Sequence, residues 1–349
     1  MAGPGFLCIG AQKAGTTWLW RNLAEHPGIW LPRHVKEFHY FNDRDDLLTQ
    51  GWRRRVRGRQ RADKRWRRRV KTLAGAHRGD RSLAGLRWEV DMMLRRPSDD
   101  WYLSLFDRKD GRLTGDMTPD YLALRPETIE QVAALLPDVK IVLMLRNPIE
   151  RLWSAAAFFK GFWKGREPTS LEREEVTRFF RAPHNRRLGD YLGGLRRWRE
   201  HYPPDRFFLG FAEDIAFRPE ELLRRAEEFL GLDPFPEHEA AERRINWMPS
   251  RTMPGWAAAD LAGLHAEDLL RLSRRYGGHA DWWRHTGTAL ADADPAAVLT
   301  YPLFSGPLWE EWLTQADPGV DPQEWTPPLQ SGPLPEVRRS GNPPAAPSV

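Results

Sequence analysis

Cysteine is nearly absent from the sequence, and long hydrophobic runs are missing altogether. Cys8 is the single cysteine in 349 residues, which excludes an intrachain disulfide and a zinc site made of several cysteines. No apolar run approaches the roughly 20 residues that span a bilayer. Residues 1–5 carry neither a basic stretch nor a long apolar one, so no signal peptide is expected. These absences predict a cytoplasmic protein with no membrane span.

Acidic residues are nearly absent from one segment, residues 51–71. Twelve Arg and Lys accompany a single acid there, Asp63, which gives a local charge of +11 in a chain whose net charge is +5. Apolar residues such as Trp52, Val56 and Val70 recur at helical spacing, which favours an amphipathic helix with solvated arginines. The alternative is a basic patch that recruits an anionic acceptor, nucleic acid or a membrane surface.

Short apolar runs alternate with helical patterns along most of the chain. Strands are predicted at residues 6–9, 139–145 and 207–211, and helices at about 16–25, 149–159, 188–201, 219–230 and 264–276. This alternation predicts an α/β fold with a mainly parallel sheet. We expect one domain over residues 1–315, with a variable, Arg-rich insert at 42–110. Residues 316–349 are rich in proline and lack periodicity, so they are predicted to form an extended or disordered tail.

A glycine-bounded loop joins the first predicted strand to the first predicted helix. Residues 10–17 read GAQKAGTT. Such a turn lets backbone N–H groups approach phosphate oxygens, and the helix N-terminus adds partial positive charge. Lys13 adds a full charge, and either Thr16 or Thr17 is expected to cap the helix. The pattern indicates a phosphate-binding loop, with an ordinary strand-to-helix connection as the alternative.

The loop departs from the Walker A pattern of ATP- and GTP-binding proteins. Gly10 and Gly15 have the required separation, but Thr16 stands where GxxxxGK[ST] has lysine. Lys13 comes three positions earlier instead. An atypical P-loop nucleotide kinase therefore stays as the alternative function.

Several motifs, in order, resemble those of sulfotransferases that use 3′-phosphoadenosine 5′-phosphosulfate (PAPS). GAQKAGTTWL at 10–19 resembles their 5′-phosphosulfate loop. HP at 26–27 with KEFHYF at 36–41 is similar to a stretch of the heparan-sulfate-type and bacterial members, and LRNPIERLWSAAAFF at 145–159 resembles the 3′-phosphate motif. The resemblance extends from about residue 6 to 232, and more weakly to 283. It implies a P-loop-like, three-layer α/β/α fold and sulfuryl transfer from PAPS, which leaves the bisphosphate PAP.

The resemblance also implies roles for single residues. Glu37 would be the general base, Lys13 would stabilise the leaving bisphosphate, and His39 would lie near the acceptor. The donor-binding residues implied or assigned are Gln12, Lys13, Ala14, Gly15, Thr16, Thr17, Trp18, Arg146, Ser154 and Arg251. No metal ion is implied.

Each of these residues also has a purely structural interpretation. Without the resemblance, Glu37 is better explained as a surface carboxylate beside Lys36. His39 could equally be a half-buried strand residue, and Trp18 could be part of the core. Arg146 follows a strand at its carboxyl end, where open α/β sheets bind ligands, yet it also suits an ion pair at the start of a helix. Ser154 suits either a phosphate contact or close packing.

The acceptor is not identified by the sequence. Met117 stands where heparan-type relatives carry a lysine, which weakens the case for a highly anionic glycan. We expect a hydroxyl or amine of a glycan, lipid or secondary metabolite. A protein that only binds nucleic acid would give Lys13, Glu37 and Arg146 no role, so this function is not expected. The presence of these residues also argues against an inactive relative of the sulfotransferases.

Overall fold

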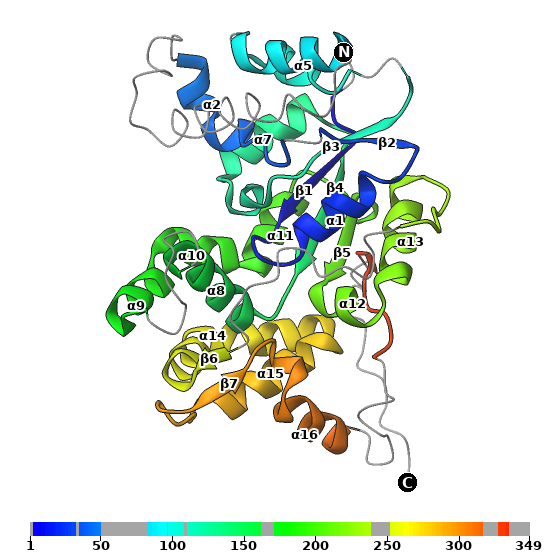
Figure 1. Ribbon diagram of the computed structural model, residues 1–349. Helices are drawn as coiled ribbons and strands as arrows, with labels where there is room; N and C mark the ends of the chain where they lie inside the picture. The colour runs from blue at the N-terminus through cyan, green and yellow to red at the C-terminus, as the bar shows by residue number, and fades with distance from the viewer. Residues whose placement is uncertain are drawn as a thin grey trace.

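A six-stranded sheet forms the centre of the protein (Figure 1). The computed structural model describes residues 3–32, 35–49, 83–95, 97–107, 110–161, 171–238, 252–316 and 327–334. The strand order is β2-β3-β1-β4-β5-β8, and every pairing is parallel except that of β5 with β8. The strands are β1 (Phe6–Gly10), β2 (Ile29–Trp30), β3 (Leu113–Asp116), β4 (Lys140–Leu145), β5 (Phe207–Phe211) and β8 (Gly332–Pro333). The predicted α/β fold with a mainly parallel sheet is confirmed.

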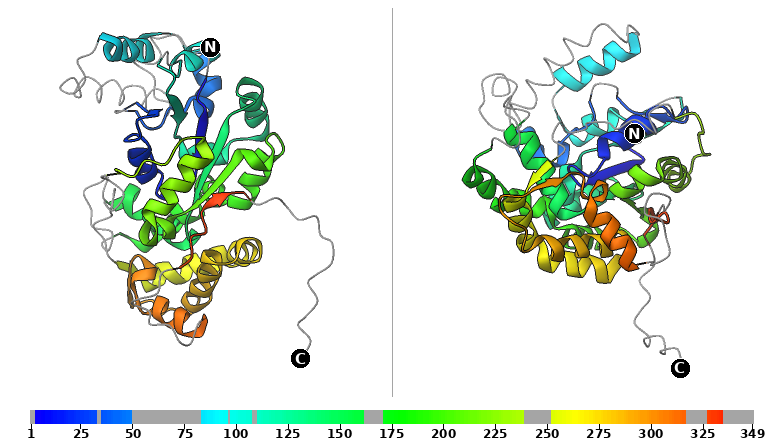
Figure 2. Two further views of the ribbon diagram at one scale, coloured as in Figure 1. Left: turned by 90° about the vertical axis from the view of Figure 1, so that its right-hand side faces the viewer. Right: turned by 60° about the horizontal axis from the view of Figure 1, so that its bottom comes forward.

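Helices cover both faces of this sheet (Figure 2). Helix α1 (Thr16–Leu23) contacts α13 (Pro219–Leu230), and α7 (Pro126–Leu135) contacts α11 (Tyr191–Arg199). All residues of β1 and β5 are buried, as expected for strands covered on both sides. The remaining elements before residue 218 are α2 (Tyr40–Thr49), α5 (Leu83–Leu94), α6 (Asp99–Ser104), η1 (Pro119–Ala123), α8 (Pro148–Ala156), η2 (Ala157–Gly161), α9 (Arg173–Arg181), α10 (Pro183–Gly189), η5 (Pro204–Arg206) and α12 (Ala212–Phe217).

A second group of helices lies beyond the lower end of the sheet in Figure 1. It comprises α14 (Gly255–Tyr276), α15 (His279–Leu290), α16 (Pro307–Ala316), the antiparallel pair of β6 (Thr252–Pro254) and β7 (Val298–Thr300), and η6 (Leu303–Ser305). Helix α14 packs on α8, which follows β4. The C-terminal helices therefore lie beyond the carboxyl ends of the parallel strands.

Three predicted helices have different bounds in the structure. Helix α14 begins at Gly255 rather than 264, because Ala257, Ala258 and Leu261 continue its buried face. The pattern at 188–201 is split at Asp190, whose side chain caps α11 by accepting a hydrogen bond from the Gly193 amide at 2.9 Å. Helix α8 ends at 156 and continues as a π-helical turn, η2.

Part of the predicted tail packs on the sheet. Residues 327–334 are described, and β8 pairs antiparallel with β5. Asp214 Oδ2 accepts hydrogen bonds from the amide of Ser331 at 2.7 Å and from its hydroxyl at 2.6 Å. The sequence pattern did not predict this contact. The Arg-rich residues 51–71 lie outside the described residues, and among the residues that are described no helix is long and apolar enough to cross a membrane.

Candidate functional site

The loop between β1 and α1 leaves the N-terminus of the helix without a side-chain cap. Gly15 is the N-cap, with a left-handed φ of 89°, and no side chain caps the helix. The prediction that Thr16 or Thr17 caps it is wrong, because both residues already belong to the helix. A Cβ on Gly15 would lie 2.2 Å from Ile215 Cδ1. The first intrahelical bond runs from the Leu19 amide to the Gly15 carbonyl, so the preceding amides of the first turn have no intrahelical partner and suit an anion.

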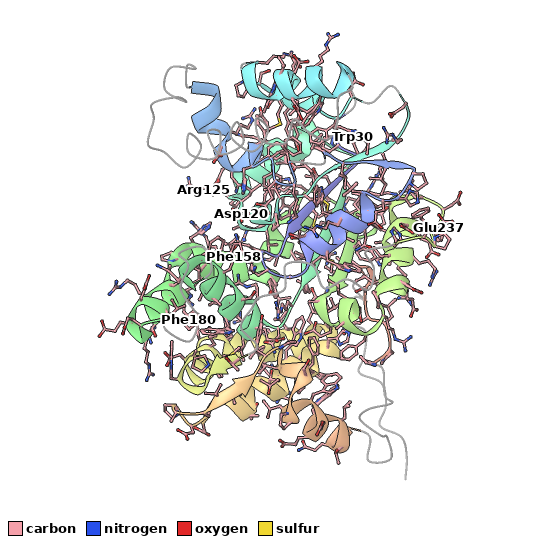
Figure 3. All side chains as sticks on the ribbon, viewed as in Figure 1. Trp30, Asp120, Arg125, Phe158, Phe180 and Glu237 are labelled. Atoms are coloured by element: carbon pink, nitrogen blue, oxygen red, sulfur yellow. The ribbon has the colours of Figure 1, made fainter. Side chains whose placement is uncertain are left out.

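Lys13 lies in the middle of this loop, also with a positive φ of 68°. Its ammonium is 4.1 Å from the centre of the Phe158 ring, which projects from η2 (Figure 3). Burial, followed by the charges of Arg146 and Lys36, lowers the pKa of Lys13 to about 8. The ammonium is therefore poorly solvated and feels the charges of two other cations, so a bound anion would stabilise its charged form.

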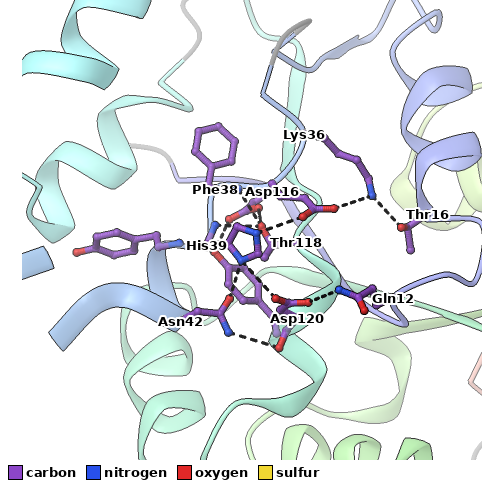
Figure 4. A network of polar contacts seen from close by, with 12 residues as sticks. Gln12, Thr16, Lys36, Phe38, His39, Asn42, Asp116, Thr118 and Asp120 are labelled. Carbon is purple, nitrogen blue, oxygen red and sulfur yellow. Dashed lines mark hydrogen bonds and ion pairs between the residues drawn. The ribbon is translucent and has the colours of Figure 1, made fainter. Parts of the chain in front are cut away.

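Lys36 links the loop to Glu37 (Figure 4). Its ammonium donates to Thr16 Oγ1 at 2.8 Å and to Glu37 Oε1 at 3.2 Å. Burial raises the pKa of Glu37, but contacts with His39 and Lys36 outweigh it and bring the pKa to about 2. The Glu37 side chain, which is 39% exposed, is thus an ionised carboxylate beside the loop.

His39 lies between two carboxylates (Figure 4). Its Nε2 is 3.2 Å from Glu37 Oε2, and its Nδ1 is 3.3 Å from Asn42 Oδ1 and 3.7 Å from Asp120 Oδ2. Gln12 donates to the other oxygen of Asp120 at 3.3 Å. One continuous series of polar contacts therefore runs from Gln12 in the loop through Asp120 and His39 to Glu37. His39 belongs to no strand, so the strand interpretation of this residue is wrong.

A buried carboxylate supports the backbone beneath His39. Asp116 accepts from Thr118 Oγ1 at 2.6 Å and from the phenols of Tyr102 and Tyr121 at 2.9 and 2.8 Å. Thr118 Oγ1 accepts in turn from the amides of Phe38 and His39. Burial raises the pKa of Asp116. The buried Asp116 carboxylate therefore has hydrogen-bond donors within the protein. Through Thr118 it holds the backbone of the segment that carries Glu37 and His39.

Arg146 follows β4 directly and forms a second cationic centre. It donates to Tyr301 Oη at 2.6 Å and to the Lys13 carbonyl at 3.3 Å, which joins it to the loop. It also forms an ion pair with Glu150 at 3.5 Å, as the alternative interpretation of this residue predicted. Ser154 is buried on α8, and its interaction with the Tyr301 phenol lowers the pKa of Tyr301, although burial raises it. Tyr301 is thus hydrogen-bonded to Arg146 and lies near Ser154.

The other predicted residues divide into three groups. Gln12 in the loop and Thr17 in the first turn of α1 are half-buried, Ala14 and Trp18 are buried in the core, and Arg251 lies outside the described residues. The buried position of Trp18 favours the core interpretation over a contact with adenine. In the described part of the chain, no three His, Cys, Asp or Glu side chains gather as metal ligands would.

Three residues that contact the predicted site were not among the predicted ones. Lys36 lies within the KEFHYF motif at 36–41, and Asp120 lies three residues after Met117, so both positions are near residues that the sequence singles out. Tyr301 is 155 residues from Arg146 and carries no local signal. Together the cations, the helix N-terminus and the two hydroxyls of Ser154 and Tyr301 suit a ligand with two separated anionic groups.

Comparison with known proteins points to one family. The Sulfotransferase family model matches residues 4–237. Human heparan sulfate glucosamine 3-O-sulfotransferase 6 is 29% identical over 146 residues, which is 38% of this chain and 39% of that protein. Human bifunctional heparan sulfate N-deacetylase/N-sulfotransferase 3 is 22% identical over 260 residues, or 68% of this chain and 23% of that protein. The chain thus aligns with well under half the length of these relatives.

A solved structure has the same fold. The crystal structure of a sulfotransferase from Alicyclobacillus acidocaldarius superposes with a TM-score of 0.51 at 24% identity. The superposition covers 78% of this chain and 96% of that chain.

Proposed function

This chain belongs to the sulfotransferase family, and from that premise we propose that it moves a sulfuryl group from PAPS to a hydroxyl or amine of an acceptor. The observation that carries the proposal is the unbroken series of contacts from the α1 N-terminus through Thr16 and Lys36 to Glu37. It connects an anion-binding loop to an ionised carboxylate within two hydrogen bonds. Sulfuryl transfer needs the donor phosphosulfate and the general base to be close together, so that both reach the acceptor.

The residues fit the two ends of the donor. The 5′-phosphosulfate would bind the amides at the start of α1, with Lys13 and Lys36 beside it. The 3′-phosphate would bind Arg146 and Ser154, and the bond between Arg146 and the Lys13 carbonyl sets the two subsites relative to each other. An arginine fork and a hydroxyl are the groups that bind a terminal phosphate well.

The reaction follows from these positions. The acceptor oxygen or nitrogen attacks sulfur, the bond from sulfur to the 5′-phosphate oxygen breaks, and its electron pair stays on PAP. The acceptor proton passes to Glu37. Lys13 balances the charge that develops on the leaving oxygen, where a fixed cation lowers the barrier most. With a pKa of about 2, Glu37 is a weak base while His39 and Lys36 both contact it, so a shift of Lys36 towards the donor would make Glu37 a stronger base.

The acceptor is a hydroxyl or amine of a glycan, lipid or secondary metabolite. The relatives named for heparan sulfate favour a glycan. Met117 is buried, however, and adds no cation for an anionic chain.

The test is calorimetric titration of PAP without magnesium. The wild type should bind, and Arg146→Ala should lose roughly 30-fold or more in affinity, since a charged partner is removed. The matched control is Arg112→Ala, because Arg112 is a half-exposed arginine whose guanidinium pairs with Asp110 among the residues that the structure describes. Binding of ATP with magnesium instead of PAP would favour the kinase alternative.

A further inference from the structure

The segment around Tyr301 reaches the Arg146 centre from outside the region that the family model matches, which ends at residue 237. The Tyr301 phenol accepts a hydrogen bond from Arg146 at 2.6 Å, and the guanidinium carbon is 5.3 Å from the ring centre. Ser154 lies near the same phenol and lowers its pKa. The hydroxyl is therefore hydrogen-bonded to one of the two residues expected to hold the 3′-phosphate and lies near the other.

The phenol can also donate. A tyrosine hydroxyl has one proton and two acceptor positions, and Arg146 uses an acceptor position. The contact of the proton with the Glu150 carbonyl is long, at 3.5 Å. Burial raises the pKa of Tyr301 despite the nearby arginine, so the phenol keeps its proton at neutral pH. A phosphate oxygen beside Arg146 would offer this proton a stronger, charged acceptor.

The protein fixes Tyr301 firmly. The Leu303 amide donates to the fully buried Glu150 carboxylate at 2.9 Å. Two further bonds join α8 and its cap to the C-terminal helices: Asn147 Nδ2 to Thr286 Oγ1 at 2.9 Å, and Trp153 Nε1 to the Thr252 carbonyl at 3.2 Å. A hydroxyl held in this way loses little freedom when it binds a ligand.

We infer that Tyr301 is a third ligand of the donor's 3′-phosphate, donating its hydroxyl proton to the phosphate oxygen that Arg146 and Ser154 also hold. The inference rests on the proposed function. It makes the C-terminal helical region part of the donor site, and it makes Tyr301 a residue that discriminates 3′-phosphorylated nucleotides from those without that group.

The experiment compares two nucleotides on two variants. Tyr301→Phe removes the hydroxyl and keeps the ring. PAP affinity should fall about tenfold or more, the usual loss for a hydrogen bond to a charged group. Affinity for adenosine 5′-monophosphate, which lacks the 3′-phosphate, should change less than about twofold. The control is Tyr202→Phe, which removes another buried hydroxyl, bonded to the Leu136 carbonyl at 2.9 Å. It should leave both affinities unchanged.

The outcomes separate the two proposals. If Tyr301→Phe weakens both nucleotides equally, or neither, Tyr301 is structural and the inference is wrong, while PAP binding by the wild type still supports a sulfotransferase. If the wild type binds adenosine 5′-monophosphate as tightly as PAP, no 3′-phosphate subsite exists and both proposals fail. Thermal unfolding of each variant, measured alongside, shows whether the folded fraction is the same.

Discussion

The two halves of the site hold positive charge in different ways. Around the loop, Lys13 and Lys36 contact a ring, a hydroxyl and the 39% exposed Glu37. Around Arg146, the guanidinium lies among Tyr301, Glu150 and a backbone carbonyl. Burial opposes the charge of Arg146, but Tyr301 and the carboxylates of Glu150 and Glu213 outweigh it and raise the pKa of Arg146.

This difference matches two tasks. The loop half holds a lysine whose pKa is lowered to about 8 and a carboxylate whose pKa is lowered to about 2, so its proton and charge balance depends on what binds there. The Arg146 half keeps its charge at any accessible pH. We therefore expect the loop half to determine the rate and the Arg146 half to determine donor affinity.

The largest expected effect is on the rate. Glu37→Gln should lower sulfuryl transfer by roughly 10²–10⁴-fold, the range for loss of a general base, because the amide cannot take the acceptor proton. PAP affinity should stay close to that of the wild type. The measurement is transfer of label from ³⁵S-PAPS to an acceptor found by screening, with titration of PAP beside it.

Glu130→Gln is the matched control, since Glu130 is an exposed carboxylate on α7. It should leave the rate unchanged. If Glu37→Gln transferred sulfuryl groups at the wild-type rate, Glu37 would not be the general base. The proposal that the loop half determines the rate would then also be wrong.

The next effect is on the pH dependence of the same half. His39 and Lys36 both lower the pKa of Glu37, so Lys36→Met should raise that pKa while the His39 contact stays in place. The base acts when ionised, so kcat/KM should begin to fall at a higher pH as the solution is acidified, by about 1 to 3 pH units. The wild type, with a pKa of about 2, should show no such loss in the range where the protein is folded.

Normalised pH profiles of kcat/KM test this shift. Lys140→Met, which removes a lysine bonded to the Phe229 carbonyl, should keep the wild-type profile. Superimposable profiles for Lys36→Met and the wild type would mean that Lys36 does not act through Glu37.

The loop half was predictable from the sequence because its residues are close together along the chain. The apolar runs of β1, β4 and β5 are long enough to be identified as buried strands, and the loop follows the first of them. The Arg146 half required contacts across 155 residues to Tyr301. Neither periodicity nor spacing carries information on a contact formed only after the C-terminal helices pack on α8.

Local competition explains other differences. Thr16 is a favourable capping residue, but the left-handed turn at Gly15 leaves its hydroxyl to Lys36. Asp190 ends one helix and caps the next, which a continuous apolar pattern conceals. The proline-rich tail has no core-forming pattern of its own, and residues 327–334 are fixed by Asp214, which is distant in sequence.

The smallest effect we expect is on stability, and it separates strain in the loop from ordinary helix propensity. Gly15→Ala forces a side chain into a left-handed conformation and against Ile215, so the free energy of unfolding should fall by about 1–2 kcal/mol. Gly263→Ala, in the middle of α14 with nothing within 4 Å of its new methyl group, should raise it by up to about 1 kcal/mol. Urea unfolding measures both. If the two substitutions changed stability equally, the left-handed turn at Gly15 would not require glycine. The missing side-chain cap of α1 would then need an explanation other than the geometry of this glycine.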